Sequence, residues 1–234
     1  FPGVVADPKV ADPFAVEAAH NYPYDVPNVS VDYLRQEIGI NVGYWRSVSH
    51  ALNCFVAESF MDELAHAAKK DPFEFRRDLL GKQPRFKRVL EEAAAMAGWG
   101  KAPAGRHQGI ALMEGYGTYL AQVAEVSVTG GALKVHRVVC AVDCGQMVNP
   151  AIVESQIESG IVFGLTAALW GEITLDRGRV RETNFDRYRL MRLNEAPAIE
   201  VRLLESREAP GGVGEPSTSV VAPAVCNAIF AATG

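Results

Sequence analysis

Hydrophobic residues in the first hundred positions recur mainly at helical spacing. Apolar side chains at positions 52, 55, 56, 60, 61, 64 and 68 form one stripe of a helix predicted over 51–68, and we expect this stripe to face the core. The stretch Asp71-Pro72-Phe73-Glu74 is a capping sequence that predicts a second helix, ending at Gly81. A third helix is predicted over Pro84–Ala97. The segment before these helices is predicted to be extended, with a strand over 29–43.

After residue 105 the pattern changes to the alternation of half-buried strands. Three successive strands are predicted over 106–114, 118–128 and 132–142, and Thr129-Gly130-Gly131 joins the last two as a hairpin. Asn149-Pro150 caps a long helix that reaches about Trp170. Shorter strands are predicted near 172–175 and over 198–204. A last apolar helical pattern runs over 219–232, opened by Pro216 and Ser217.

These elements predict an α+β fold with two mixed subdomains of sheet and helix. The first would span residues 1–101 and be rich in helices after its extended start. The second would span residues 102–234, and the glycine- and proline-containing stretch over 98–105 would link the two. At 234 residues and 48% hydrophobic content, the chain can bury a sizeable core.

Charge and cysteine content narrow the classes of function. The net charge of −5 comes with no basic stretch containing interleaved aromatic residues, so nucleic acid is not an expected partner. The longest apolar run, over 161–170, contains Gly164 and is too short to cross a bilayer, so we expect no membrane span. The four cysteines stand in apolar contexts, which indicates free thiols and favours a reducing compartment.

Two further features bear on what kind of chain this is. The chain begins at Phe1 and stops after a helical run, so we expect it to be an excised piece or a processed subunit of a larger protein. His136, Cys140 and Cys144 suggest zinc, but four residues along a strand span roughly 13 Å, too far apart for ligands of one ion.

The stretch over 211–217, Gly-Gly-Val-Gly-Glu-Pro-Ser, is the most informative part of the chain. It connects a predicted strand to a predicted helix and places the carboxylate of Glu215 at the start of that helix. Free backbone N–H groups and the positive end of the helix dipole favour an ionised carboxylate, which can act as a base. Alternatively, Glu215 only complements the dipole while the glycines make a tight turn. A third glycine at the offset of a dinucleotide-binding fingerprint is missing.

Five motifs occur in an order that resembles the molybdenum hydroxylases, the family that includes xanthine dehydrogenase and aldehyde oxidase. The resemblance covers nearly the whole chain and is greatest to the C-terminal part of the large, or beta, subunit of bacterial isoquinoline 1-oxidoreductase-type enzymes. The motifs are Trp45-Arg46-Ser47-Val48-Ser49-His50, Ala124-Glu125-Val126, the stretch from Val142 to Pro150, Gln156, and Gly212-Val213-Gly214-Glu215-Pro216.

The resemblance implies a molybdopterin-binding fold of the aldehyde oxidase/xanthine dehydrogenase type. The implied cofactor is molybdopterin cytosine dinucleotide, whose dithiolene holds the molybdenum, so no protein side chain is expected to ligate the metal. Glu215 matches the catalytic base. The positions implied to bind cofactor are Arg46, Ser47, Gln156, Gly160 and Gly214.

A purely structural role remains an open alternative at several of these positions. Arg46 can be a surface arginine, Gln156 a solvent-facing glutamine, and Gly160 a site of simple helix packing. Ser49 and Ser159 stand where relatives commonly carry glycine, and a serine hydroxyl there could hydrogen-bond to phosphate.

The implied function is the oxidation of aldehydes or the hydroxylation of N-heterocycles with water-derived oxygen, and the sequence does not choose between these substrates. The implied partners are the N-terminal half of the large subunit and a small [2Fe-2S] subunit that carries the iron–sulfur clusters, so the piece alone is expected to be inactive. Alternatively, the chain is a non-catalytic module for assembly or cofactor loading. An unrelated hydrolase is disfavoured because Glu215 has no evident partner carboxylate. Relatives occur in both cytoplasm and periplasm, and the thiols favour the cytoplasm.

Overall fold

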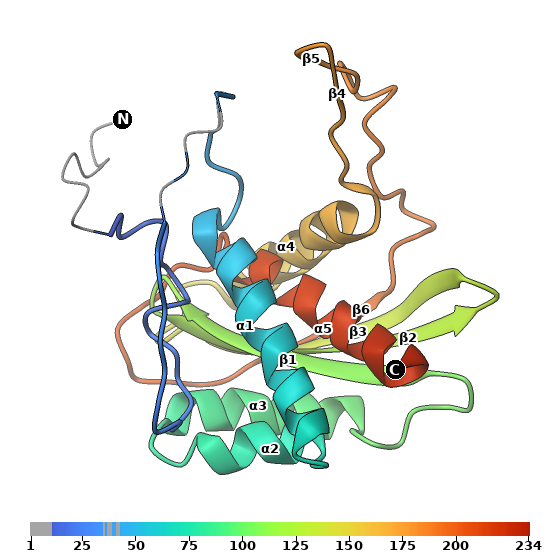
Figure 1. Ribbon diagram of the computed structural model, residues 1–234. Coiled ribbons are helices and arrows are strands. Elements are labelled where there is room, and N and C mark those ends of the chain that lie inside the picture. Colours follow the sequence, from blue (N-terminus) through green and yellow to red (C-terminus); the bar gives the residue numbers. More distant parts are fainter. Residues whose placement is uncertain (1–10, 35, 37–38, 41–42) are drawn as a thin grey trace.

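The computed structural model describes residues 11–34, 36, 39–40 and 43–234. A four-stranded mixed sheet has the order β1-β2-β3-β6, in which only the β3–β6 pair is parallel (Figure 1). Two short strands, β4 and β5, form a separate hairpin. The elements are α1 (Val48–Ala67), α2 (Pro72–Leu79), α3 (Pro84–Ala97), β1 (His107–Gly115), β2 (Thr118–Thr129), β3 (Ala132–Asp143), α4 (Pro150–Trp170), β4 (Leu175–Asp176), β5 (Arg179–Val180), β6 (Ala198–Leu203) and α5 (Pro216–Thr233).

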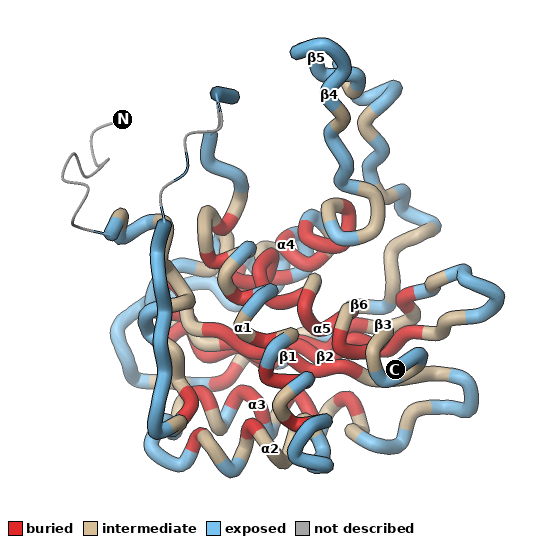
Figure 2. Tube along the Cα trace, in the orientation of Figure 1, coloured by how far each residue is buried: buried red, intermediate tan, exposed pale blue. Residues whose placement is uncertain are grey.

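Helices cover both faces of the sheet (Figure 1). On one face α5 packs on β1 and β2, and α1 and α4 pack against α5. On the other face α3 packs on β2 and β3, with α2 beside it. Because successive strand residues point to opposite faces, Ala111 and Met113 of β1 join the core under α5, whereas Ile110 and Leu112 join the core over α3. Buried backbone therefore runs through the middle layer (Figure 2).

The observed architecture confirms the predicted α+β fold class with a mixed sheet. The strands β1, β2, β3 and β6 and the helices α2 to α5 lie where the pattern predicts them, within about three residues at each end. The predicted division at residue 101 falls in the loop between α3 and β1. Helices from both sides of that loop pack on the same sheet, and the division into two subdomains stays a prediction.

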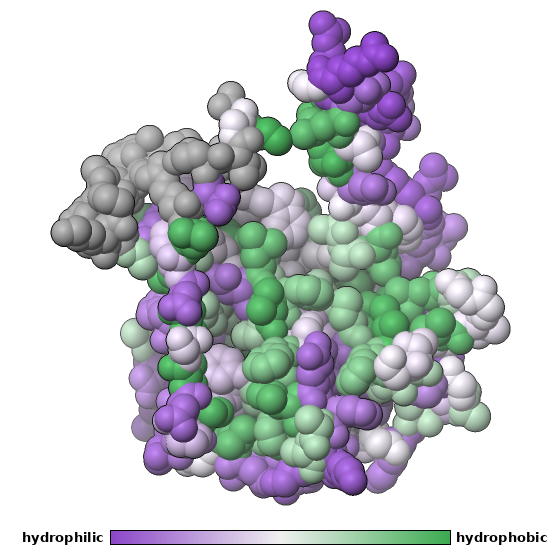
Figure 3. Space-filling model, viewed as in Figure 1, coloured by the Kyte–Doolittle hydropathy of each residue, from purple (hydrophilic) through white to green (hydrophobic). Residues whose placement is uncertain are grey.

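The prediction for the face of α1 is wrong. The predicted apolar stripe is largely exposed: Leu52 is 71% exposed and Val56 is 66% exposed, while only Met61 of the stripe is fully buried. The buried face instead carries Glu58 and Asp62. Figure 3 shows hydrophobic side chains gathered on the outer surface in the region of α1.

A buried ion cluster explains why α1 turns toward the core a different face from the predicted one. The guanidinium of Arg76, on α2, is fully buried; its Nε donates to Glu58 Oε2 at 3.0 Å and its Nη1 to Asp62 Oδ1 at 2.5 Å. Tyr24 Oη donates to Glu58 Oε1 at 2.8 Å, and Leu112 N donates to Glu58 Oε2 at 3.1 Å. Since the cluster ties α1 to α2 and to β1, the charged side of α1 faces inward.

Two predicted strands also differ from the structure. None of the described residues within 29–43 is in a strand; residues 35, 37, 38, 41 and 42 lie outside the described residues. Near 172–175 only Leu175 is in a strand, as the first residue of the two-residue β4. In the second segment the ladder is confined to the two residue pairs of the β4–β5 hairpin.

Two helices, α4 and α5, have the length and hydropathy of a membrane span. Helix α5 lies in the core between the sheet, α1 and α4, and 61% of its most apolar window is buried. Core helices of soluble folds pass the same test of length and composition. The expected absence of a membrane span stays a prediction.

Candidate functional site

The loop between β6 and α5 places Glu215 beside the start of α1. Helix α5 begins at Pro216, so Glu215 is its N-cap residue, but its side chain makes no capping hydrogen bond. Instead the carboxylate turns toward α1, where Ser47 N donates to Glu215 Oε2 at 3.2 Å. The Ser47 hydroxyl hydrogen-bonds to that of Ser219 on α5. Residues 47 and 215, 168 positions apart in the sequence, are thus in direct contact.

Tyr116 is a member of this site that the sequence reasoning missed. It lies in the turn between β1 and β2, its backbone oxygen accepts a hydrogen bond from Gly212 N at 2.8 Å, and its ring centre lies 4.8 Å from that of His50. Burial, followed by the influence of the Glu215 carboxylate, raises the pKa of Tyr116 well above the ordinary value, so the phenol stays protonated. A tyrosine in a tight hairpin turn, where asparagine or glycine is usual, is the signal that could have found it.

Arg46 holds together three segments of the site. Its Nε donates to the backbone oxygen of Gly214 at 2.7 Å, its Nη1 to Ser159 Oγ at 3.1 Å and its Nη2 to Gln156 Oε1 at 3.2 Å. Its guanidinium also lies 5.6 Å from the ring centre of Phe163. Arg46 is therefore not a free surface arginine. The Ser159 hydroxyl is one of the three acceptors that bind Arg46.

The two glycines among the predicted site residues have different surroundings. A Cβ built on Gly160 would lie 2.0 Å from Ser217 Oγ, so close packing of α4 on α5 explains why no side chain is present there. A cofactor contact at Gly160 stays a prediction. A Cβ on Gly214 would meet nothing nearer than Gln156 Oε1, at 3.9 Å, so the backbone of the Glu215 loop has open space beside it.

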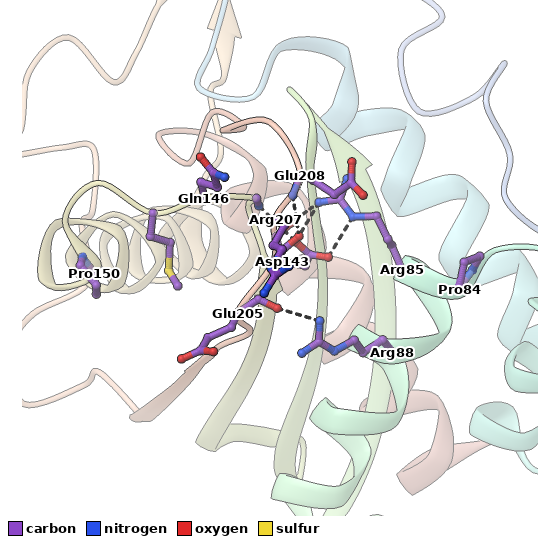
Figure 4. Close-up of a pocket in the computed structure, with 12 residues that line it drawn as sticks. Pro84, Arg85, Arg88, Asp143, Gln146, Pro150, Glu205, Arg207 and Glu208 are labelled. Atoms are coloured by element: carbon purple, nitrogen blue, oxygen red, sulfur yellow. Dashed lines mark hydrogen bonds and ion pairs between the residues drawn. The ribbon is translucent and has the colours of Figure 1, made fainter.

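A cavity of about 700 Å³ lies apart from Glu215, between the start of α3, the end of β3 and the loop after β6 (Figure 4). Arg85 donates to both carboxylate oxygens of Asp143, each at 2.8 Å, and Arg88 Nη1 donates to Glu205 O at 2.9 Å. Burial alone would raise the pKa of Asp143, but Arg85 and Gly145 N together hold it below the ordinary value. This cavity contains none of the predicted site residues, and two of its charged groups, Arg85 and Asp143, bind each other.

The polar groups around the Glu215 loop suit a ligand that carries negative charge and amide groups. They comprise a guanidinium, a carboxamide and the backbone of a glycine loop, with Arg46, Gln156 and Gly214 in contact. Guanidinium and amide groups are donors that match phosphate and heterocycle oxygens. Within the described residues no group of three or more His, Cys, Asp or Glu side chains is placed to hold a metal ion.

Comparisons with known proteins agree with this chemistry. The family model described as "Molybdopterin cofactor-binding domain" matches residues 55–197. The chain is 36% identical to the isoquinoline 1-oxidoreductase subunit beta of Brevundimonas diminuta, over 90% of the chain and 28% of the relative. It is 32% identical to the membrane-bound aldehyde dehydrogenase [pyrroloquinoline-quinone] of Gluconacetobacter polyoxogenes, over 97% of the chain and 33% of the relative.

A solved structure shows the same fold. The quinoline 2-oxidoreductase from Pseudomonas putida 86 matches 80% of this chain and 50% of its own with a TM-score of 0.70, at 13% identity. The chain spans about a third of the length of the two curated relatives above. On the match of the family model over more than half of its residues, the chain belongs to the molybdopterin cofactor-binding domains of the molybdenum hydroxylase family.

Proposed function

We propose that the chain is the C-terminal molybdopterin-binding part of a molybdenum hydroxylase catalytic subunit, with Glu215 as its base. The observation that carries the proposal is the contact of Arg46 with Gln156 and with Gly214, directly beside Glu215. These residues come from the start of α1, from α4 and from the loop before α5. Packing of the core alone does not require an arginine, an amide and a carboxylate to lie together at a half-exposed surface.

In this proposal each residue has a separate task. Arg46 and Gln156 bind the cofactor. At Ser47 and Gly214 the backbone leaves room for the cofactor to approach the loop. When bound, the molybdenum cofactor supplies the two-electron oxidation. Glu215 accepts the proton that is released when water-derived oxygen is added to the substrate carbon, a step that needs an ionised carboxylate. The Ser47 N–H donates to that carboxylate at 3.2 Å and so restricts its orientation.

The substrate class is inferred from the names of the relatives, and the form of the cofactor is inferred from the resemblance to the family; both belong to the proposal. One relative is named for isoquinoline and another for an aldehyde, so the substrate is an N-heterocycle or an aldehyde. We propose molybdopterin cytosine dinucleotide as the cofactor, with iron–sulfur clusters on a small partner subunit. The free cysteines favour a cytoplasmic enzyme.

The exposed apolar face of α1 supports a partner that completes the subunit. Leu52, Val56 and Phe60 are each more than half exposed and lie along one helix, an arrangement that is costly in water. We propose that the N-terminal half of the large subunit covers this face.

The test is the Glu215→Gln variant of the assembled enzyme, with Glu154→Gln as the matched control on the exposed side of α4. We expect Glu215→Gln to lose turnover by a factor on the order of a hundred or more, at unchanged molybdenum content, because the proton acceptor is removed. The control should behave as wild type. Full turnover in Glu215→Gln would contradict the proposal and favour a non-catalytic module for assembly or cofactor loading.

A further inference from the structure

One face of α4 holds the segment that precedes α1. Gln156, Ser159 and Phe163 are spaced three and four residues apart, so they lie on the same side of the helix. Arg46 Nη2 donates to Gln156 Oε1 at 3.2 Å, and Arg46 Nη1 donates to Ser159 Oγ at 3.1 Å. The ring centre of Phe163 lies 5.6 Å from the guanidinium carbon and 5.0 Å from the ring centre of Trp45. All three side chains of α4 therefore contact residues 45 and 46.

Packing of the core does not explain the position of Phe163. Phe163 is 40% exposed, and within the described residues it belongs to neither of the two hydrophobic cores. Trp45, which it contacts, is also 40% exposed. A guanidinium within about 6 Å of an aromatic ring centre is attracted to the ring. The contact with the segment of Arg46, rather than burial, accounts for a phenylalanine at this position.

The contacts with α4 and with the loop before α5 restrict the Arg46 guanidinium. The group has five N–H bonds in one plane, and three of them are used: Nε donates to Gly214 O, Nη1 to Ser159 and Nη2 to Gln156. Phe163 adds a contact with an aromatic ring. An arginine that is already held in place loses less conformational entropy when a ligand binds. The guanidinium is thus prepared for a ligand by its own neighbours.

The same contacts decide which groups remain to bind a ligand. The oxygen of Gln156 accepts from Arg46, so the NH2 group of the carboxamide is left to donate. Arg46 has two further N–H bonds. The oxygen of Ser159 accepts from Arg46, so its hydroxyl hydrogen is directed away from the guanidinium. Together these side chains offer donors, which match the oxygen atoms of phosphate and carbonyl groups.

We propose that Ser159 and Phe163 are positioning residues that hold the Arg46 guanidinium in one orientation, ready to donate to oxygen atoms of the cofactor. The inference rests on the proposed role of Arg46 in binding the molybdenum cofactor and adds the means by which this arginine is fixed. Ser159 acts through its hydrogen bond to Nη1 and Phe163 through its ring. Arg46 precedes Ser47, whose N–H donates to Glu215 Oε2, so the held arginine lies beside the proposed base.

The mobility of the guanidinium, measured on the chain itself without cofactor, tests the positioning directly. With ¹⁵N-labelled arginine, the Nε–H signal of Arg46 is the one that is lost in Arg46→Lys. We expect its heteronuclear NOE to fall toward that of an exposed arginine in Ser159→Ala and in Phe163→Leu. Ser155→Ala is the matched control for the hydroxyl, because Ser155 Oγ donates only within its own helix. Phe185→Leu is the control for the ring, because Phe185 is 76% exposed. Both controls should leave the signal unchanged.

Conservative variants separate positioning from a general loss of packing. Ser159→Thr keeps the hydroxyl, and Phe163→Tyr keeps the aromatic ring. Both should therefore show the wild-type NOE at Arg46.

In the assembled enzyme the same variants should weaken retention of the cofactor. We expect molybdenum to be lost about twofold to tenfold faster from Ser159→Ala and Phe163→Leu than from wild type, at a temperature below unfolding, as for one hydrogen bond or one cation–π contact. In an Arg46→Lys background, which lacks the planar fork of donors, the two substitutions should have no further effect. Equal effects in both backgrounds would show that Ser159 and Phe163 act without Arg46, and would overturn the inference.

Failure of this inference and failure of the proposed function give different results. An unchanged NOE at Arg46 in Ser159→Ala or in Phe163→Leu overturns the positioning role of that residue and leaves the proposed function intact. Wild-type retention of molybdenum in Arg46→Lys overturns the proposed role of Arg46 in binding the cofactor. Full turnover in Glu215→Gln overturns the proposed base.

Discussion

Replacement of Arg76 tests the buried ion cluster that turns the charged face of α1 inward. The Arg76→Met variant replaces the guanidinium with an unbranched apolar side chain and leaves Glu58 and Asp62 buried, at 3% and 4% exposure, without their cation. Arg76 also donates to the backbone oxygen of Glu58 at 2.7 Å, and that acceptor loses its partner as well. Breaking a buried pair from one side costs about 3–5 kcal/mol. Against a total stability of about 5–15 kcal/mol, the variant should be near the limit of folding.

The loss should depend on pH in a defined direction. Burial is the largest influence on Glu58 and Asp62, and it raises the pKa of both carboxyls even with Arg76 beside them. A carboxyl whose folded pKa lies above its unfolded value loses stability as pH rises through that interval, by about 1.4 kcal/mol for each pKa unit. Without Arg76 the interval widens. The deficit of Arg76→Met should therefore be larger at pH 7 than at pH 5.

Urea unfolding followed by circular dichroism, at both pH values, measures the deficit. The control is Arg77→Met, one position along α2, because its guanidinium is 38% exposed and bonds only to Glu74 of the same helix. An exposed pair of this kind contributes about 0.2–1 kcal/mol. A loss of less than about 1 kcal/mol in Arg76→Met, or equal losses in the two variants, would refute the view that the cluster holds α1, α2 and β1 together.

Three other changes test separate parts of the fold. Gly109→Ala should lower stability by about 1–3 kcal/mol or more in thermal unfolding, because its Cβ would lie 2.1 Å from the backbone of α5, whereas Gly81→Ala has nothing within 4 Å and should be neutral. Asp143→Asn should cost about 1.5–3 kcal/mol at pH 7. Since Arg85 lowers the pKa of Asp143, that contribution is present above the unfolded pKa and is lost as pH falls through the folded value, so urea midpoints of variant and wild type should converge in acid. Val56→Glu should change the stability of this chain by less than about 0.5 kcal/mol but reduce recovery of the assembled enzyme, and a large loss of stability would place Val56 in the core.

Local patterns account for most of the fold that the sequence predicted. The apolar runs of β1 to β3 become strands whose central residues are buried on both faces, because helices cover both sides of the sheet. The cap at Asp71 is present, with its side chain accepting from the backbone of Phe73 and Glu74. The face of α1 was mispredicted for a physical reason. Hydrophobic spacing assumes that apolar residues face inward, but the buried Arg76 draws Glu58 and Asp62 into the core instead. No periodicity within α1 itself reveals a cation supplied by another helix.

Local patterns predicted one part of the candidate site and not the rest. The glycine loop and the helix start at Pro216 gave Glu215 from local chemistry, whereas Arg46 and Gln156 were expected only from the resemblance to a family. Their contact joins residues 110 positions apart, which spacing along the chain cannot predict. Tyr116 was missed because it belongs to a hairpin turn rather than to a motif. Its contact with the glycine loop, through Gly212 N, joins residues almost a hundred positions apart.

Because β6 lies at the edge of the sheet, the stability of the whole fold and the local stability of the segment before Glu215 are two different quantities. Strand β6 pairs only with β3, and none of its residues is fully buried, so its hydrogen bonds open more easily than those of β2. The loop that carries Glu215 follows this strand and is attached to the central part of the sheet through Gly211 N, which donates to Cys144 O at 2.8 Å. Transient detachment of β6 would loosen the first part of this loop, while Gly212 N on Tyr116 O, Arg46 on Gly214 O and the start of α5 still hold its second part. The opening of β6 is thus a local equilibrium of its own, which amide hydrogen exchange along β6 reports and a melting temperature does not.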